Sequence, residues 1–280
     1  MALYTAETLT ATLTAQGNQN LPVVGHFNYA DSDGYFTDLG TEVFPASNAV
    51  ARSTYNFWEV TPSAGRAIIE MDLPGGFSRS VSFVSVAAHN LGDFSDSGCL
   101  VRPQYSSDRI TWTNPMPPVT PTDNSAMGFR FAPVLAPYWR FNITSLPAEN
   151  VRIGVLFFGR DVMFPHDIYA DYAPPLLQTN VELQSNVSEG GHLLGNSVVR
   201  KSSSTSANIQ YGTPDYFRDA EWLDFQADFN NGQGFFWAWR PGEYSDFYYG
   251  WRSGSPIVPA NTGAGGNMSA SMKMRLYDDP

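Results

Sequence analysis

Carboxylates that could serve as an acid–base pair are concentrated in residues 215–229, which carry Asp215, Asp219, Glu221, Asp224 and Asp228. Glycosidases use two such groups, one on each side of the bond that breaks. Here the acidic residues lie mostly between apolar ones at helical spacing, a pattern typical of the solvated face of an amphipathic helix. We therefore interpret the segment as a helix rather than as a catalytic centre.

Other residues with catalytic potential are scattered. None of the four histidines lies at a spacing typical of zinc ligands; they are His26, His89, His166 and His192. The sequence contains no Gly-x-Ser-x-Gly nucleophile motif and no phosphate-binding glycine loop. His89 is expected to satisfy backbone groups at a strand end, and Cys99, the sole cysteine, to fill space in the core. We predict no catalytic residues, no metal, no cofactor and no enzymatic activity.

Residues 31–34 read Asp-Ser-Asp-Gly, which is how some calcium-binding loops begin. Such a loop needs further oxygen ligands and a closing bidentate glutamate at a fixed spacing, and Glu42 is out of register for that role. The favoured interpretation is a turn built from Asp and Gly, with a structural calcium site as the alternative.

Two polar loops interrupt the first half of the chain, over residues 92–98 and 114–124, and the second contains four prolines. Loops between strands commonly carry binding residues because a rigid sheet positions them. If the chain binds a ligand, the candidate residues are Asp93, Asp96, Asn114 and Asn124.

The elements that must position these loops are short strands. In residues 138–144, Trp139, Phe141 and Ile143 alternate with polar residues, which predicts a strand with one dry face. Residues 80–88 are apolar on both faces, as expected of a central strand that is covered on both sides. Sheets with a dry face must pack on a second layer, so the sequence predicts a mainly β protein that contains a β-sandwich.

The chain divides into four predicted segments. Residues 1–20 are rich in Thr and Ala and form an N-terminal arm or edge strand, with a loosely ordered terminus as the alternative. Residues 21–160 form the sandwich. Residues 161–177 contain three prolines and form a linker. Residues 178–280 form a second β domain with one helix, a flexible serine-rich loop at 202–206 and a regular closing strand at 268–277.

Aromatic residues crowd two strands of the second half, and six of them are candidates for a subunit interface, because aromatic side chains concentrate at interface centres. They are Phe235, Trp237, Trp239, Tyr248, Tyr249 and Trp251.

The 280-residue chain has a formal net charge of -11. An acidic surface repels phosphate backbones and anionic lipids, so nucleic acid and membranes are excluded as expected partners. The N-terminus lacks the basic start and apolar run of a signal peptide, and we expect synthesis in the cytoplasm.

The order His89-Asn90-Leu91, Gln104-Tyr105-Ser106-x-Asp108 before Trp112, and Tyr138-Trp139-Arg140-Phe141 resembles the galactose-binding-like (discoidin-type) β-sandwich in tail proteins of tailed bacteriophages. The resemblance covers roughly residues 20–160. The second half resembles, more weakly, the ring-forming domain of distal tail proteins. This implies a structural minor tail, distal tail or baseplate protein of the virion. Its partners would be copies of itself, in a threefold or sixfold ring, and other tail proteins.

Two further hypotheses remain open. A carbohydrate-binding module or adhesin would recognise a glycan on a bacterial surface through the two polar loops. A polysaccharide-degrading enzyme would use carboxylates of residues 215–229 and is the least favoured.

Overall fold

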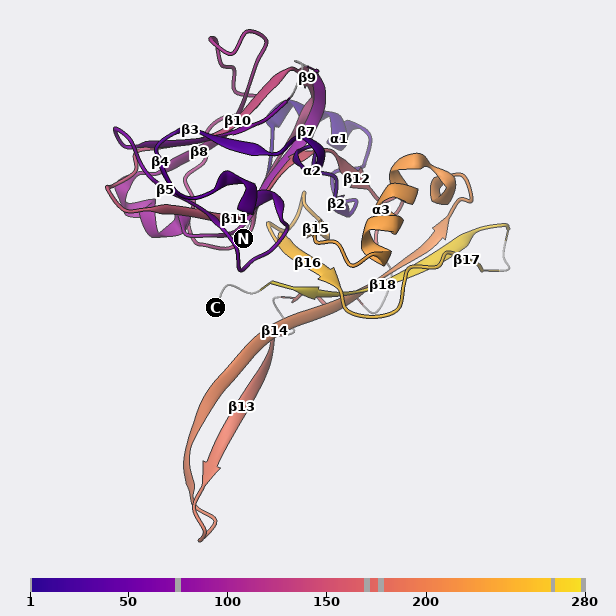
Figure 1. The fold of residues 1–280 in the computed structure, drawn as a ribbon. Helices are drawn as coiled ribbons and strands as arrows, with labels where there is room; N and C mark the ends of the chain where they lie inside the picture. Colours follow the sequence, from indigo (N-terminus) through magenta and orange to yellow (C-terminus); the bar gives the residue numbers. More distant parts are fainter. Residues whose placement is uncertain (1, 74–76, 169–171, 176–178, 263–264, 278–280) are drawn as a thin grey trace.

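The computed structural model describes residues 2–73, 77–168, 172–175, 179–262 and 265–277, which form three β-sheets and a few helices (Figure 1). The strands are β1 (Ala2–Thr5), β2 (Val23–Gly25), β3 (Tyr35–Leu39), β4 (Thr41–Phe44), β5 (Trp58–Thr61), β6 (Arg66–Met71), β7 (Arg79–His89), β8 (Leu100–Ser106), β9 (Met127–Ala136), β10 (Tyr138–Thr144), β11 (Val151–Gly159), β12 (Asp161–Met163), β13 (Thr179–Val187), β14 (Leu193–Gly212), β15 (Phe235–Ala238), β16 (Tyr248–Arg252), β17 (Ala260–Asn261) and β18 (Met268–Leu276). The α-helices are α1 (Glu7–Ala15), α2 (Ala30–Asp33) and α3 (Ala220–Asn230), and the 3-10 helices are η1 (Ala46–Val50), η3 (Leu91–Ser97) and η5 (Tyr216–Arg218).

The first two sheets form the predicted β-sandwich. One has the strand order β1-β9-β7-β11-β5-β4 and the other β3-β6-β10-β8. Alternate residues of each strand enter the core between them, as Phe141 of β10 and Phe129 of β9 do with ring centroids 5.7 Å apart. The mainly β fold with a β-sandwich, expected from the alternating strands, is confirmed.

The six-stranded sheet is covered on both faces, as predicted for residues 80–88. Val84 and Val86 of β7 point into the sandwich core, whereas Phe83 and Ala87 point into a second core on the opposite face. A third sheet supplies the cover there. Its strand β2 lies so close that a Cβ added at Gly25 would sit 2.0 Å from the Phe83 ring, which explains why that position holds a glycine.

The third sheet has the order β12-β2-β15-β16-β18-β14-β13, with β17 paired to β18. Strand β15 is apolar on both faces because it is covered twice. Phe236 and Ala238 face the sandwich, and Phe235 and Trp237 face a third core that α3 completes. The strands β15 and β16 therefore lie between the sandwich and α3 (Figure 1).

This layering corrects the predicted subunit interface. Four of the six aromatic candidates are buried within the single chain and offer no surface to a second copy: Phe235, Trp237, Tyr248 and Tyr249. The prediction has other subunits covering these side chains, whereas the sandwich and α3 of the same chain cover them. Trp239 and Trp251 are partly exposed, so for these two an interface stays a prediction.

Two short strands join the halves of the chain. Strand β2, from the segment assigned to the sandwich, pairs with β15, and β12, from the segment assigned to the linker, pairs with β2. Of the remaining predicted linker, residues 169–171 and 176–177 lie outside the described residues.

One local prediction is confirmed only in part, and a second is wrong. The N-terminal arm begins with edge strand β1 but continues as helix α1, whose Leu13 is buried, so tertiary packing overrides the extended preference of its threonines. Residues 202–206 were expected to be a flexible loop. They are part of β14 because backbone pairing with β18, as between Ser204 and Arg275, compensates for their weak strand preference.

The other elements of the second half agree with the sequence. Helix α3 begins after Asp219, whose carboxylate accepts a hydrogen bond from the Glu221 backbone N–H. Trp222, Phe225 and Phe229 form its buried face. The closing strand β18 alternates as predicted, with Met272 and Met274 buried. No helix in the described part of the chain is long and apolar enough to cross a bilayer.

Candidate functional site

The predicted ligand residues fall in two places. Asn124 and Asp93 come together: the Asn124 Nδ2 donates to Asp93 Oδ1 at 2.8 Å, and the Gly92 N–H donates to Asn124 Oδ1 at 2.8 Å. Asp96 is exposed on the same loop. Asn114 lies beside β8 instead, where its Oδ1 accepts from Gln104 Nε2 at 2.7 Å. Asn124 therefore links the two loops to each other. Asn114 instead contacts Gln104, which belongs to a larger group of polar side chains on the four-stranded sheet.

This group lies on the side of the four-stranded sheet opposite the sandwich core, here called the outer face. Its charged and amide side chains come from all four strands: Asp38, Arg66, Glu70, Arg102, Gln104, Arg140 and Asn142. Strand pairing sets Arg140 directly between Glu70 of β6 and Gln104 of β8. Since residues on one face alternate with core residues, the same pattern that buries Trp139 and Phe141 presents Arg140 and Asn142 outward.

Gln104 is the centre of a hydrogen-bond network on the outer face. Its Oε1 accepts from Arg140 Nε at 2.9 Å and from Asn142 Nδ2 at 2.8 Å, and its Nε2 donates to Asn114. Arg140 also lies 3.8 Å from the Asp38 carboxylate. The network fixes these side chains, so a ligand would meet donors that are already positioned.

A turn at residues 107–112, here called the covering turn, folds over the outer face. The Arg109 Nε is 2.9 Å from Glu70 Oε1, and the Arg109 guanidinium lies over the Phe36 ring at 5.1 Å. The half-buried Trp112 packs against Arg140, with 3.9 Å between the guanidinium carbon and the ring centre. The covering turn thus adds one cation and one aromatic ring to the polar network.

Local hydrogen bonds shape the covering turn. The Asp108 carboxylate accepts from the backbone N–H groups of Ile110 and Thr111 at 2.9 and 2.8 Å, and from the Ser106 hydroxyl. These bonds lower the pKa of Asp108 to about 2. Arg109 adopts a left-handed backbone with φ 60°. The Ser-x-Asp motif found in the sequence therefore fixes the conformation of the covering turn, which directs Arg109 and Trp112 toward the outer face.

Several buried polar atoms on the outer face lack a hydrogen-bond partner among the described residues. They include Glu70 Oε2 and Asn142 Oδ1, in side chains that are almost fully buried, with residue exposures of 2% and 1%. Burial raises the pKa of Glu70 to about 7, because desolvation of the carboxylate outweighs the attraction of Arg109. Native proteins rarely leave such groups unpaired, so their concentration here indicates a place where a polar ligand or water completes the bonding.

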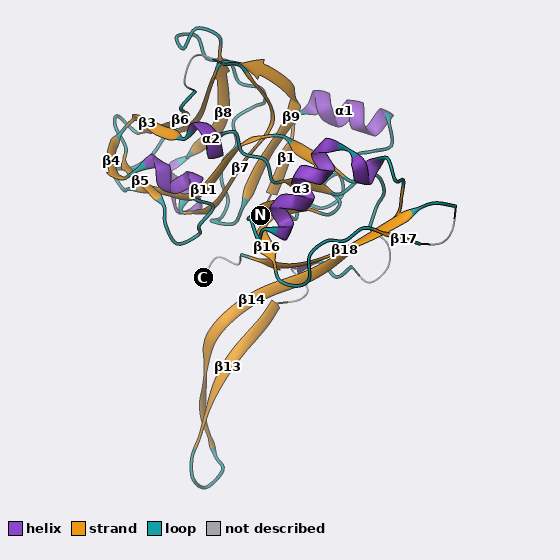
Figure 2. Ribbon diagram, turned by 45° about the vertical axis from the view of Figure 1, so that its right-hand side comes forward, coloured by secondary structure: helices purple, strands orange, loops and turns teal. Residues whose placement is uncertain are grey.

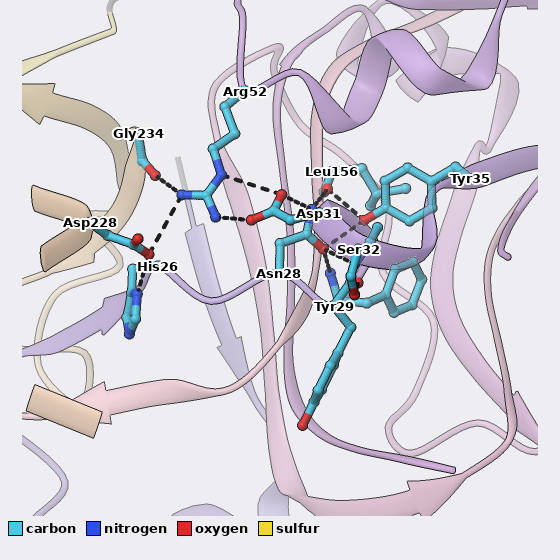
Figure 3. Close-up of polar contacts among 12 residues, drawn as sticks. His26, Asn28, Tyr29, Asp31, Ser32, Tyr35, Arg52, Leu156, Asp228 and Gly234 are labelled. Carbon is cyan, nitrogen blue, oxygen red and sulfur yellow. Dashed lines mark hydrogen bonds and ion pairs between the residues drawn. The ribbon is translucent and has the colours of Figure 1, made fainter. Parts of the chain in front are cut away.

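A second polar cluster lies where the sandwich meets α3 (Figure 3). Arg52 pairs there with Asp31, donates to the Gly234 carbonyl at 3.2 Å and lies 3.9 Å from Asp228. His26 Nδ1 is 2.8 Å from the Asp228 carboxylate. A groove of about 430 Å³ borders Asp31, Arg52 and Asp228. Because these charges satisfy one another across three segments of the chain, we interpret the cluster as a structural link between layers.

The same contacts involve the carboxylates of the alternative calcium site. The Asp31 carboxylate faces Arg52, and Asp33 receives a bidentate pair of hydrogen bonds from Arg79, with its closest nitrogen at 2.9 Å. Both carboxylates are therefore used within the protein, and the segment forms the short helix α2, ended by Gly34, instead of the predicted turn. No group of three potential metal ligands occurs among the residues that the structure describes.

Sequence reasoning missed most of the outer face. Glu70 and Arg109 carried no signal, because their meeting depends on how the covering turn folds over the sheet. The sequence did place Arg140 and Asn142 on the wet side of their strand, and Trp112 lay in the motif of the resemblance. The outward alternation of Arg, Asn and Gln on adjacent strands was the available signal.

The chain matches no known family model, and no curated protein matches it significantly. Its fold is similar to solved carbohydrate-binding modules. Chitosan-binding module 1 of a chitosanase/glucanase from Paenibacillus sp. IK-5 is 19% identical, with 47% of this chain and 98% of that chain covered and a TM-score of 0.38. A family 32 module of AlyQ, in complex with 4,5-unsaturated mannuronic acid, is 15% identical, covers 51% and 98% of the two chains and has a TM-score of 0.34. Similarities this remote carry no argument about the family or the ligand of this chain.

Proposed function

We propose that this chain is a carbohydrate-binding protein and that the outer face, with the covering turn, is its binding surface. The observation that supports this most is the Gln104 network. It gathers an amide, a guanidinium and a second amide on a rigid sheet, and the buried Asn142 Oδ1 finds no hydrogen-bond partner among the residues that the structure describes.

The chemistry suits a sugar better than an apolar ligand. Sugar hydroxyl groups both donate and accept, so they match a surface that mixes amide, carboxylate and guanidinium groups. The C–H face of a pyranose packs against an aromatic ring, and Trp112 lies beside the polar groups. A buried acceptor that a ligand hydroxyl satisfies contributes specificity, since a ligand without that hydroxyl leaves it unpaired.

The proposed role is binding without catalysis. The two carboxylates of the outer face lie close to arginines: Glu70 to Arg109, and Asp38 to Arg140. A glycosidase pair would instead have to present both carboxylates to one glycosidic bond.

A glycan array followed by calorimetric titration tests the proposal. The unmodified chain should bind at least one oligosaccharide class, and Trp112→Ala and Gln104→Ala should each weaken that binding at least about tenfold, or about 1.4 kcal/mol. Tyr55→Ala, at an aromatic residue that is 87% exposed elsewhere on the surface, is the matched control and should change nothing. Loss of binding only on changing Asp93 or Asn124 would move the site to the loops predicted from the sequence.

A second candidate function, self-assembly, is favoured by one feature. Strand β13 and the first half of β14 form a two-stranded ribbon that projects alone from the body of the protein (Figure 2). Its cross-strand pairs Leu183–Val198 and Val187–Leu193 are exposed. An isolated hairpin is marginally stable in water, so a ribbon with exposed apolar pairs is suited to lie against another chain.

This ribbon would give the ring predicted from the tail-protein resemblance a physical basis, in place of the aromatic strands that are now buried. Native mass spectrometry at micromolar concentration tests it. An oligomer that dissociates when Leu183 and Val198 are both changed to Ser would support assembly. A stable monomer of the unmodified chain would exclude it and leave the carbohydrate proposal untouched.

A further inference from the structure

Two arginines of the outer face have no ion-pair partner within the described part of the chain. Arg66 and Arg102 lie on opposite sides of β10, where Arg66 pairs with Thr144 and Arg102 with Asn142 in the strand register. The Nε atoms of both are buried and lack a hydrogen-bond acceptor in the same described residues. A guanidinium that is partly desolvated and unpaired is costly unless an anion completes it.

The outer face is also positive where the rest of the protein is negative. With the covering turn it carries four arginines, Arg66, Arg102, Arg109 and Arg140, against three carboxylates, those of Asp38, Glu70 and Asp108. The whole chain has a net charge of -11. Such a local excess of positive charge, on a protein that otherwise repels anions, attracts an anion to this one surface.

The arginines are close enough to act on one another. The pKa of Arg140 is lowered to about 10; desolvation is the largest cause, the positive charges of Arg66 and Arg102 contribute to the lowering, and the carboxylates of Asp38 and Glu70 oppose it. A negative group placed between Arg66 and Arg102 would relieve this repulsion.

We propose that the outer face selects acidic sugars, whose carboxylate binds between Arg66 and Arg102 while a neighbouring hydroxyl donates to Asn142 Oδ1. This rests on the proposed carbohydrate-binding function and deepens it. The guanidinium fork matches a carboxylate in two parallel hydrogen bonds, which an ester or a neutral hydroxymethyl group does not reproduce.

Paired ligands test this selectivity on the full chain. Oligosaccharides of galacturonic, glucuronic, mannuronic and sialic acids are compared with their methyl esters, which keep the stereochemistry and remove the charge at the cost of one added methyl group. At least one acid should bind at least about tenfold more tightly than its ester, with affinity that falls as salt increases. Arg66→Gln and Arg102→Gln should lower the affinity for the acid to that of the ester.

Matched variants separate charge from folding. Arg160→Gln, at an exposed arginine that pairs with Glu221, should leave the acid preference intact. Arg102→Lys keeps the positive charge at this position, so it should retain part of the preference for the acid over its ester. Thermal unfolding of each variant shows whether a loss of affinity comes from misfolding. If a Gln variant is misfolded, the relative affinity of the Arg102→Lys variant for the acid and its ester decides the test.

The failures are distinguishable. Equal binding of acids and esters, or of neutral glycans alone, would overturn the acidic selectivity and leave carbohydrate binding intact. No binding of any acidic, esterified or neutral glycan would overturn both.

Discussion

Phe157 of β11 and Phe236 of β15 pack edge to face, with ring centroids 5.1 Å apart and an interplanar angle of 84°. Both rings are fully buried, one on the six-stranded sheet and the other on the third sheet. The sandwich and the second half of the chain therefore share a hydrophobic core, and the free energy of that core is lost if either half unfolds.

Replacing Phe236 with Ala should destabilise the protein by about 3–5 kcal/mol, because it removes a buried ring from a core that cannot fully collapse. Denaturant unfolding followed by tryptophan fluorescence measures the loss. Tyr55→Ala, at an exposed aromatic, should change stability by less than about 0.5 kcal/mol. Two well-separated unfolding transitions in the unmodified chain would show that the halves do not share this core.

Glu70 makes stability depend on pH. Its pKa is raised to about 7 in the folded chain, so between the usual carboxyl pKa and about 7 the folded state holds a proton that the unfolded state has lost. The stabilising contribution is complete below pH 4.5 and is lost as the pH rises to about 7, with a limit of about 3 kcal/mol.

Glu70→Gln should remove this component, so the difference in unfolding free energy between the two proteins should change between pH 5 and 8 and be flat above that. Denaturant titrations at each pH measure it. A difference that does not vary with pH would mean that Arg109 keeps the carboxylate ionised throughout.

Asp108 should matter for binding more than for stability. Asp108→Ala removes the acceptor for the backbone of Ile110 and Thr111, so the covering turn loosens and Arg109 and Trp112 lose their fixed positions. We expect about a five- to tenfold loss of glycan affinity, about 1 kcal/mol, from the cost of ordering the turn on binding.

The matched control is Asp96→Ala, at an exposed carboxylate on the opposite loop, which should leave affinity unchanged. Isothermal titration calorimetry with the best glycan from the array gives both values. Unchanged affinity in the Asp108 variant would show that the covering turn takes no part in binding.

Much of the fold follows from patterns that are local to one strand. Trp139, Phe141 and Ile143 indicated the dry face of β10, and the two apolar faces of β7 indicated a central strand. The sequence did not reveal which part of the chain, or which second copy, buries each apolar strand face. An apolar face such as that of β15 reads the same whether a second copy or the same chain buries it, so Trp237 and Tyr249 were wrongly assigned to an interface.

The binding surface depends even more on long-range geometry. Arg140 and Asn142 were recognisable as outward-facing, but Gln104 joins them only through the register of β8 and β10. Glu70 and Arg109 are 39 positions apart in the sequence and meet because a turn set by Asp108 folds over the sheet. Strand register and turn conformation are decided by tertiary packing, which a single sequence does not display.

The central claim is that a glycan contacts the outer face. Side-chain amide signals in a two-dimensional 15N–1H NMR spectrum, recorded during titration with the tightest-binding glycan, test it directly. The amides of Gln104 and Asn142 should shift on saturation while that of Asn124, on the other loop, stays in place. A saturating glycan that shifts Asn124 and leaves Gln104 and Asn142 unmoved would contradict the account.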